Sequence, residues 1–436
     1  MNAEHQTIST ASLSLGVNPR GLTFDSLVVS PAAASGSGSG SSRDVLVGFE
    51  DKEAYRERLF FGSTVGRYAN RLPAGETQLS TGAKISLSGV DSVCLHGGEA
   101  GFDTLPWTRI NRPDSSLFPL DDPEHPLPPL ASDPHAPITE ASAMFRLYSP
   151  AGSDGFPCTL ETEALVVVSE PEKGDAPDSA VGTVKVVLRS RIMPDADPGI
   201  EQGTPVNLTV HWGFRLDDGL EPDILGHTLY IDSTELVSLD EKGLSTGSID
   251  SIPQNGQDYD FYSNKQGRRI GESYPAVGID RNFLLHPSPS EPPTPLSHEP
   301  QLVLTAPSKL EEGPRVRLSF KSSMPSVQIY SAPGLDGTGP AKKRAHSKVP
   351  LRQPGYDRDG ALFIEFHQPV GTISHTCAID AEPENPLKRW LETRCRELGI
   401  EEETKEGGDR SWERDSLLRR GQVWESWVQV EISLAP

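Results

Sequence analysis

The sequence predicts an all-β fold, a sandwich or barrel of many short strands joined by long loops. Of the 436 residues only 35% are hydrophobic, while 39 prolines and 40 glycines make the chain rich in turns. This composition favours strands and loops over a helical bundle. Most apolar runs also alternate with period two and are separated by Pro, Gly, Asp or Asn, which is typical of strands with one buried face.

The predicted strands recur along the whole chain. Their apolar runs are LTFDSLVV (22–29), MFRLYS (144–149), ALVVVS (164–169), TVKVVLRSRI (183–192), HTLYID (227–232), QLVLTA (301–306), RVRLSF (315–320), PSVQIYS (325–331), ALFIEF (361–366) and WVQVEISL (427–434). Many short strands with such turn signals between them indicate a sandwich or a barrel.

Four stretches interrupt the strand pattern and are predicted to be insertions. Residues 30–42 are rich in Gly and Ser, as in a flexible linker. Residues 111–137 and 286–300 are rich in proline and cannot pair as central strands. Because strands resume after each insertion, including the fourth at 384–409, we expect a single domain over residues 1–436.

The fourth insertion differs from the others because its apolar residues recur at helical spacing. One helix is predicted near 386–398, and its apolar face combines Leu387, Trp390, Leu391, Cys395 and Leu398.

Charge and cysteine content exclude several classes of protein. A formal net charge of -22 disfavours nucleic acid and anionic lipid as partners. No apolar run approaches the 18 residues that a membrane span needs, and the N-terminus lacks a secretory signal, so we expect a cytoplasmic protein. The four cysteines are scattered without a CxxC pair, which argues against a disulfide scaffold or a zinc ribbon.

Two predicted strands carry side chains that a buried strand normally avoids. His211 interrupts TPVNLTVHWGFRL (204–216), and Glu365 lies among Leu, Ile and Phe in ALFIEFHQ (361–368). A lone histidine in a strand is more often structural than functional, but glutamate is rarely buried unless it is paired or functional. Further polar residues in strand-associated segments are Asn70, Arg71, His96, Asp280 and Gln328. A protonatable pair together with hydrogen-bonding side chains predicts a site.

Seven motifs occur in an order that resembles the galactose mutarotases (aldose 1-epimerases). They are GRYANRL, LHGG-x-x-GFD-x-x-x-W, TPVNLT-x-H, DILGHTLYIDSTELVSLDEKGLSTGSI, GIDRNF, VQIYSAPGLDGTG and FIE. One such motif is weak, but seven in order are specific, and the resemblance extends from 15–29 to 416–433 outside the insertions. It implies a large antiparallel β-sandwich.

The resemblance also implies a role for each polar residue. Glu365 matches the general base of the family and His211 its general acid. The sugar-binding positions of the family match Asn70, Arg71, His96, Asp280 and Gln328. The implied substrate is a free aldohexose such as galactose or glucose, and the implied reaction needs no metal, nucleotide or redox cofactor. We expect a monomer or a weak dimer.

The chain departs from the family pattern beside both catalytic positions. The family usually continues its histidine strand as HPYFNL, whereas this chain has HWGFRL, with Trp212, Gly213 and Arg215 in place of Pro, Tyr and Asn. His367 follows Glu365 on the same face if the strand continues. These changes leave the acid–base pair intact and bear on substrate preference.

Three alternative functions stay open at this point. A hexose-6-phosphate epimerase needs basic groups to hold the phosphate, for which Arg215 and Arg281 are candidates. A catalytically silent sugar-binding protein has no need of both His211 and Glu365. A metalloenzyme is disfavoured because the 11 histidines form no HxH or HExxH spacing.

Overall fold

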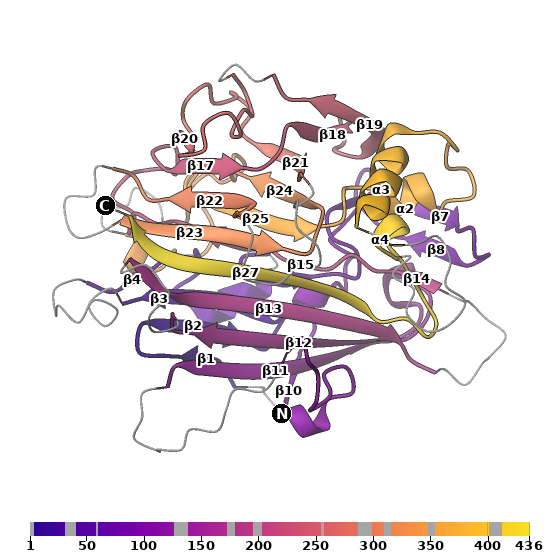
Figure 1. The fold of residues 1–436 in the computed structure, drawn as a ribbon, viewed down its shortest axis with the longest axis horizontal. Coiled ribbons are helices and arrows are strands. Elements are labelled where there is room, and N and C mark those ends of the chain that lie inside the picture. Colours follow the sequence, from indigo (N-terminus) through magenta and orange to yellow (C-terminus); the bar gives the residue numbers. More distant parts are fainter. Residues whose placement is uncertain are drawn as a thin grey trace.

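The computed structural model describes residues 4–30, 41–57, 60–125, 138–171, 179–194, 203–253, 257–286, 299–308, 315–347, 354–398, 400 and 412–435. A nine-stranded antiparallel sheet runs across the molecule (Figure 1). Its strands, from edge to edge, are β10 (Thr108–Ile110), β11 (Glu140–Ser149), β12 (Leu160–Ser169), β13 (Ala180–Ile192), β27 (Trp424–Ala435), β23 (Arg315–Ser322), β22 (Leu302–Thr305), β17 (Thr228–Ile231) and β20 (Arg268–Arg269).

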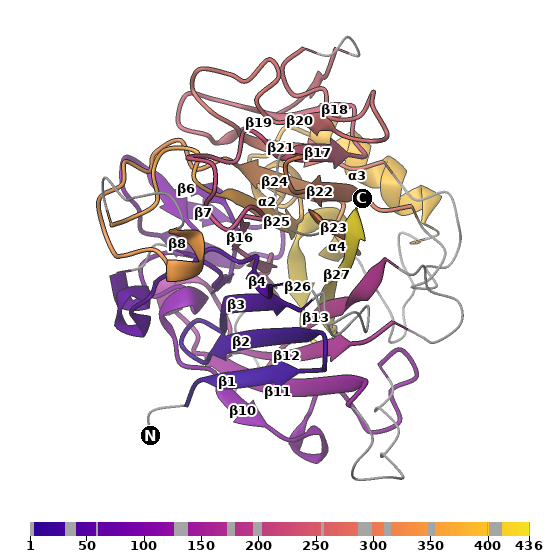
Figure 2. The same cartoon turned by 90° about the vertical axis from the view of Figure 1, so that its left-hand side faces the viewer.

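A second antiparallel sheet of six strands packs against this one. Its order is β16 (Trp212–Phe214), β25 (Leu362–His367), β24 (Ser326–Tyr330), β21 (Asp280–Leu284), β18 (Glu235–Leu239) and β19 (Ser245–Ser251). Viewed from the side, the two sheets and a smaller N-terminal sheet form stacked layers (Figure 2). The predicted antiparallel all-β sandwich is therefore confirmed.

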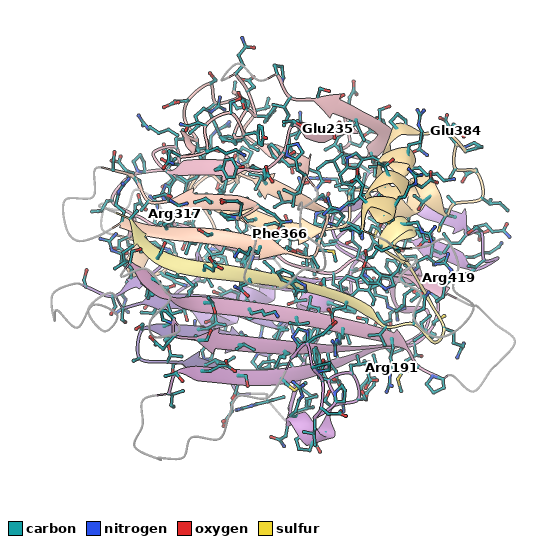
Figure 3. The ribbon with its side chains drawn as sticks, viewed as in Figure 1. Arg191, Glu235, Arg317, Phe366, Glu384 and Arg419 are labelled. Atoms are coloured by element: carbon teal, nitrogen blue, oxygen red, sulfur yellow. The ribbon has the colours of Figure 1, made fainter. Side chains whose placement is uncertain are left out.

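The main core lies between the layers and consists of alternate residues of each strand. On the six-stranded sheet, Leu362, Ile364 and Phe366 of β25 belong to it, as do Trp212 and Phe214 of β16. The residues between them face the other side of the sheet, because successive side chains of a strand point in opposite directions. Phe366 lies in the middle of the molecule in Figure 3, whereas Arg191 and Arg317 extend from strands of the nine-stranded sheet.

Smaller sheets complete the strand inventory. A four-stranded sheet, which packs on β11 and β12, consists of β1 (Gln6–Ser9), β2 (Leu13–Asn18), β3 (Thr23–Val29) and β4 (Arg43–Asp44). Four two-stranded pairs are β14 (Gly203–Pro205) with β26 (Leu417–Arg419), β15 (Thr209–Val210) with β5 (Thr64–Val65), β6 (Arg71–Pro73) with β9 (Val93–Leu95), and β7 (Gly75–Gln78) with β8 (Lys84–Leu87).

The helices gather at one edge of the sandwich (Figure 1). They are α2 (Thr372–Thr376), α3 (Pro386–Glu397) and α4 (Trp412–Asp415), and short 3-10 turns span Lys52–Glu57, Phe102–Thr104, Arg112–Asp114, Ser153–Gly155 and Arg344–His346. None of the helices in these described ranges has the length and apolar character needed to cross a membrane.

Helix α3 is the helix predicted near 386–398. The Asn385 side chain accepts a hydrogen bond from the Lys388 backbone N–H at 2.8 Å, and Pro386 occupies the first turn, as expected for a helix start. Its buried face consists of Leu387, Leu391 and Cys395. The expectation for Leu398 is wrong: this residue caps the C-terminus, where the chain leaves the helix, and is 45% exposed.

The insertions lie on different sides of the sandwich. Residues 111–125 cover the outer face of the nine-stranded sheet, where Ser116 N–H donates to Glu163 at 3.1 Å and Arg189 donates to the Leu117 carbonyl at 2.9 Å. Helix α3 instead packs on Val237 and Leu284 of the six-stranded sheet. The remaining predicted insertions lie largely outside the described residues, at 31–40 and 287–298, as do 126–137 and 401–409.

Buried histidines make the fold sensitive to acid. Burial lowers the pKa of His227 and of His346 from 6.5 to about 4. The unfolded chain therefore binds protons that the folded chain excludes between these values, so the contribution of these histidines to stability is complete above pH 6.5 and is lost as the pH drops toward 4. Each histidine accounts for about 3 kcal/mol over that window.

We expect the urea midpoint to decrease steadily from pH 7 to pH 5. The variant His346→Gln, which keeps a donor and an acceptor at this position, should unfold with a shallower pH dependence than wild type. Equal slopes for variant and wild type would contradict this explanation.

Candidate active site

A row of polar side chains crosses four neighbouring strands of the six-stranded sheet. Asn282 of β21 pairs with Gln328 of β24, and Gln328 pairs with Glu365 of β25. Trp212 pairs with Ile364, and continuing this antiparallel register by one residue sets His211 opposite Glu365. The four side chains share the face of the sheet that points away from the main core. The two predicted acid–base residues, His211 and Glu365, therefore meet although they lie 154 positions apart in the sequence.

The His211 imidazole and the Glu365 carboxyl lie side by side in a nearly dry environment. Nε2 of His211 is 3.4 Å from Oε1 of Glu365, and the two residues are only 7% and 2% exposed. Burial, together with the charge of Asp280, raises the pKa of Glu365 from 4.5 to about 8, although Arg71 opposes the shift. Burial also lowers the pKa of His211 from 6.5 to about 4. Between these two values the pair binds one proton in total.

His96 reaches the pair from a loop of unusual backbone conformation. Asn70 and His96 both have positive φ, at 65° and 51°, and they hold each other in place. The Asn70 N–H donates to Nδ1 of His96 at 3.1 Å, and the His96 N–H donates to the Asn70 carbonyl at 3.0 Å. The next residue must be glycine, because a Cβ on Gly97 would lie 2.0 Å from the Gly66 carbonyl oxygen. The His96 ring packs edge-on against His211, with centroids 5.1 Å apart.

The hydrogen bond at Nδ1 decides what His96 can bind. Since Nδ1 accepts an N–H, the neutral His96 ring carries its proton on Nε2. His96, His211 and Glu365 place potential metal-ligand atoms within 4.8 Å of one another. A metal, however, needs the bare Nε2 lone pair that this tautomer lacks. The trio therefore suits a ligand with oxygen acceptors and hydroxyl donors better than it suits a cation.

The other predicted sugar-binding residues form a hydrogen-bonded chain beside the pair. Arg71 donates from a terminal nitrogen to Oδ2 of Asp280 at 3.0 Å, and Gln328 donates from Nε2 to Oδ1 of Asp280 at 2.6 Å. The side-chain oxygen of Asn70 accepts the Arg71 N–H at 3.0 Å. All seven predicted site residues are thus joined by direct contacts.

Two buried oxygen atoms in this site lack a hydrogen-bond donor. They are Oε1 of Gln328 and Oε2 of Glu365, for which no donor exists among the residues that the structure describes. A buried acceptor without a partner costs roughly 1–3 kcal/mol. Hydroxyl groups of a bound ligand would remove this cost.

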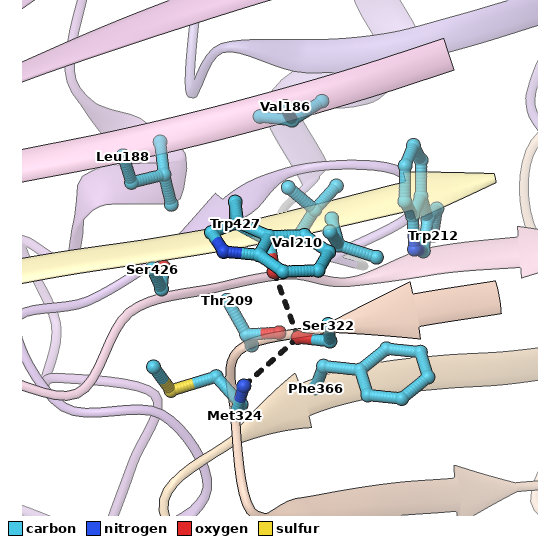
Figure 4. Close-up of a pocket in the computed structure, with 11 residues that line it drawn as sticks. Val186, Leu188, Thr209, Val210, Trp212, Ser322, Met324, Phe366, Ser426 and Trp427 are labelled. Carbon is cyan, nitrogen blue, oxygen red and sulfur yellow. Dashed lines mark hydrogen bonds between the residues drawn. The ribbon is translucent and has the colours of Figure 1, made fainter. Parts of the chain in front are cut away.

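A small cavity on the opposite side of the same strands is not part of the site (Figure 4). Trp212 and Phe366 line it from the inner face of the six-stranded sheet, which His211 and Glu365 do not share, and Val210 of β15 lines it beside them. Nearby, Ser322 Oγ donates to the Trp427 carbonyl at 2.8 Å. Trp212 is 1% exposed and packs against Phe24 and Phe214, so this departure from the family pattern belongs to the core.

The two arginines considered for phosphate binding are engaged elsewhere. Arg215 is buried, and its Nε donates to Asp217 at 2.8 Å while a terminal nitrogen donates to the Gly360 carbonyl at 3.2 Å. Arg281 follows Asp280 in β21, so the two side chains point to opposite faces of the sheet. The Arg281 guanidinium lies over the Tyr259 ring, 5.6 Å from its centroid. Arg215 makes no contact with the seven site residues in these bonds, whereas Arg281 touches one of them, because its Nη1 donates to the Asp280 backbone carbonyl at 2.9 Å.

Two aromatic residues beside His211 were missed in the sequence. The centroid of the Phe363 ring lies 4.9 Å from that of His211, and the Phe60 ring lies 6.0 Å from His211 and 4.8 Å from His96. The alternation of ALFIEFH places Phe363 on the face of Glu365, so strand periodicity could have identified it. Nothing in the sequence around Phe60 gives a comparable signal. His367 also shares this face and is fully buried, with its pKa lowered to about 4 by burial.

Comparison with known proteins finds similar sequences. The aldose 1-epimerase family model matches residues 196–359. The chain is 26% identical over 305 residues to the aldose 1-epimerase of Escherichia coli K12, with 69% of this chain and 71% of that protein covered. It is 27% identical over 310 residues to the galactose mutarotase of Bos taurus, with 70% and 72% covered.

Solved structures share the fold over the whole chain. A GalM/aldose epimerase homologue from C. elegans superposes with a TM-score of 0.65 at 17% identity, covering 99% of both chains. Galactose 1-epimerase from Lactobacillus acidophilus NCFM gives a TM-score of 0.60 at 16% identity, covering 98% of this chain and 93% of that one. The family model, the relatives and the seven motifs agree: the chain is similar to the aldose 1-epimerase (galactose mutarotase) family, and it carries a match to the family model over residues 196–359.

Proposed function

We propose that this protein is an active aldose 1-epimerase that interconverts the α and β anomers of free hexoses such as galactose and glucose. The observation that carries the proposal is the buried contact of 3.4 Å between His211 and Glu365. A protein that only binds sugar has no need of an acid and a base side by side. Two groups this close can reach the two oxygens bonded to C1 of a pyranose together.

In ring opening the pair takes up one proton and gives up another, and in ring closure the two transfers are reversed. Glu365 takes the proton of the C1 hydroxyl, the C1–O5 bond breaks, and its electron pair passes to the ring oxygen, which His211 protonates. The open aldehyde rotates about C1–C2 and closes on its other face, while each group reverses its role. Each of the two proton transfers is worth roughly 10²–10⁴-fold.

The free site holds its one proton on Glu365, because burial raises the pKa of this carboxyl and lowers that of His211. The proposed ring opening needs the proton on His211. Hydroxyl groups that donate to the carboxylate favour its ionised form. Sugar binding would therefore drive the proton from Glu365 to His211 within the same contact.

The remaining site residues suit a neutral sugar. Arg71 and Nε2 of His96 supply donors, whereas Asp280 and the unpaired oxygen of Gln328 supply acceptors. A ring with several hydroxyl groups both donates and accepts. A 6-phosphate would need a further cation, and Arg215 is already bonded to Asp217.

We also propose that the protein works in the cytoplasm. All four cysteines are buried and outside any disulfide bond, which fits a reducing compartment.

Polarimetry on freshly dissolved α-D-galactose and α-D-glucose tests the function. Wild type should equilibrate both sugars faster than the buffer blank, and Glu365→Gln and His211→Asn should each be slower by roughly 10²-fold or more. Lys84→Gln, at an exposed residue of β8, is the control and should match wild type. A wild-type rate equal to the blank would contradict the proposal, and activity restricted to hexose 6-phosphates would replace it with the phosphate-specific reaction.

The pH dependence of the rate tests the proton inventory. The pair holds one proton between pH values of about 4 and about 8, so the rate should be level across this interval. Below it His211 gains a proton while Glu365 keeps its own, and the base is lost. Above it Glu365 loses its proton while His211 stays neutral, and the acid is lost.

The variant Asp280→Asn sharpens the same measurement. Asp280 raises the pKa of Glu365, so its removal should move the alkaline limb to lower pH, whereas Asp250→Asn on the exposed face of β19 should not. Tryptophan fluorescence at each pH separates acid unfolding from the acid limb. A single titration near pH 6.5 would show that an ordinary exposed histidine, not this pair, limits the rate.

A further inference from the structure

Strand β16, which begins directly after His211, makes room for a phenylalanine of the neighbouring strand. Gly213 of β16 pairs with Phe363 of β25. A Cβ on Gly213 would lie 2.5 Å from Cγ2 of Val47 and 2.6 Å from Cε1 of Phe363. Real Cβ atoms do not approach this closely, so any side chain at position 213 would displace the Phe363 ring. The Gly in HWGFRL, where the family usually has Tyr, is thus matched by an aromatic ring from the neighbouring strand.

The Phe363 ring packs against the His211 ring at a tilt and covers one side of it. Its centroid is 4.9 Å from that of His211, and the planes are inclined by 50°. On other sides His211 contacts the ring of His96 edge-on and that of Phe60. Phe363 itself is 1% exposed, so it cannot move aside without opening the core cluster around it.

We propose that Phe363, seated over Gly213, is a positioning residue that holds the His211 ring toward Glu365 and keeps water from it. Phe363 touches no reacting atom and acts only through His211. The proposal rests on the proposed function for its effect on rate, but its effect on His211 can be measured in the free protein.

The pKa of His211 shows whether the Phe363 ring keeps water from the imidazole. The charged or titratable groups that face the ring are Glu365 and His367 on β25, Asp280 on β21, and His96 in the loop after β9. Burial is nevertheless the largest cause of the lowered His211 pKa. A shorter side chain at position 363 would admit water to the ring, and the pKa of His211 would rise toward its ordinary value of 6.5.

Phe61 offers a matched control for Phe363. It belongs to the same buried cluster, is 5% exposed, and packs its ring 5.0 Å from Phe363 and 4.8 Å from Phe49. The same change, Phe→Leu, can therefore be made at both positions with a similar loss of buried aromatic surface. Only the change at Phe363 removes a ring that contacts His211.

The experiment is an NMR titration of the histidine rings, with polarimetry on the same samples. In Phe363→Leu we expect the His211 pKa to rise by at least about one unit and kcat to fall at least about tenfold with little change in KM, as for a partly misplaced general acid. In Phe61→Leu both quantities should stay within about twofold of wild type, or within about 0.3 units for the pKa. Equal behaviour of the two variants would overturn the proposal.

Gly213→Ala tests the same contact from the other strand. The added Cβ should push the Phe363 ring away from His211 and lower kcat. Because Leu at position 363 leaves more room for this Cβ, Gly213→Ala should lower kcat by a smaller factor in Phe363→Leu than in wild type. Strictly additive effects would argue against a coupled pair. If Phe363→Leu does not fold, Phe363→Met takes its place in each comparison. A shifted His211 pKa in a protein without epimerase activity would uphold the positioning role and reject only the proposed function.

Discussion

Burial of the Glu365 carboxyl beside the His211 imidazole is the constraint on which the rest of the site depends. A carboxylate that is 2% exposed would be costly to keep ionised without a partner. One shared proton keeps the pair neutral, which removes most of this cost. It also explains why Arg71 can be bonded to Asp280 and need not neutralise Glu365 directly. Because burial raises the pKa of Glu365 and lowers that of His211, the pair keeps one proton at neutral pH that can be transferred.

Pairing of strands in the sheet fixes the distance between His211 and Glu365. Neighbouring strands lie about 4.8 Å apart whatever the loops do, so paired residues on one face meet reliably. Asn70 and His96 lack this support, since they lie in a loop with positive φ, and reciprocal backbone and ring hydrogen bonds hold them instead. The described part of the 111–137 insertion covers the far side of the other sheet, where it leaves the site untouched.

Local periodicity predicted the elements that depend on nearby residues. The runs TVKVVLRSRI and ALFIEF correspond to β13 and β25, and the helix near 386–398 is α3. The resemblance to a family selected the seven residues that the structure joins. What periodicity could not supply is which distant strands pair: nothing local in the sequence sets His211 opposite Glu365 or Gly213 under Phe363. Arg215 shows the same limit, because its burial against Asp217 depends on loops that close only in the folded chain.

The balance of donors and acceptors narrows what the site can hold. Arg71 and Gln328 each donate a hydrogen bond to Asp280, so part of their donor capacity is used. In contrast, Oε1 of Gln328 and Oε2 of Glu365 accept no hydrogen bond from the residues that the structure describes. An anionic group placed here would face acceptors, beside an Asp280 charge strong enough to raise the pKa of Glu365. Neutral hydroxyl groups can donate to these oxygens and receive from Arg71 and His96 without adding charge. An uncharged ligand therefore suits the polarity of this site better than an anionic one, in keeping with the proposed free-hexose substrate.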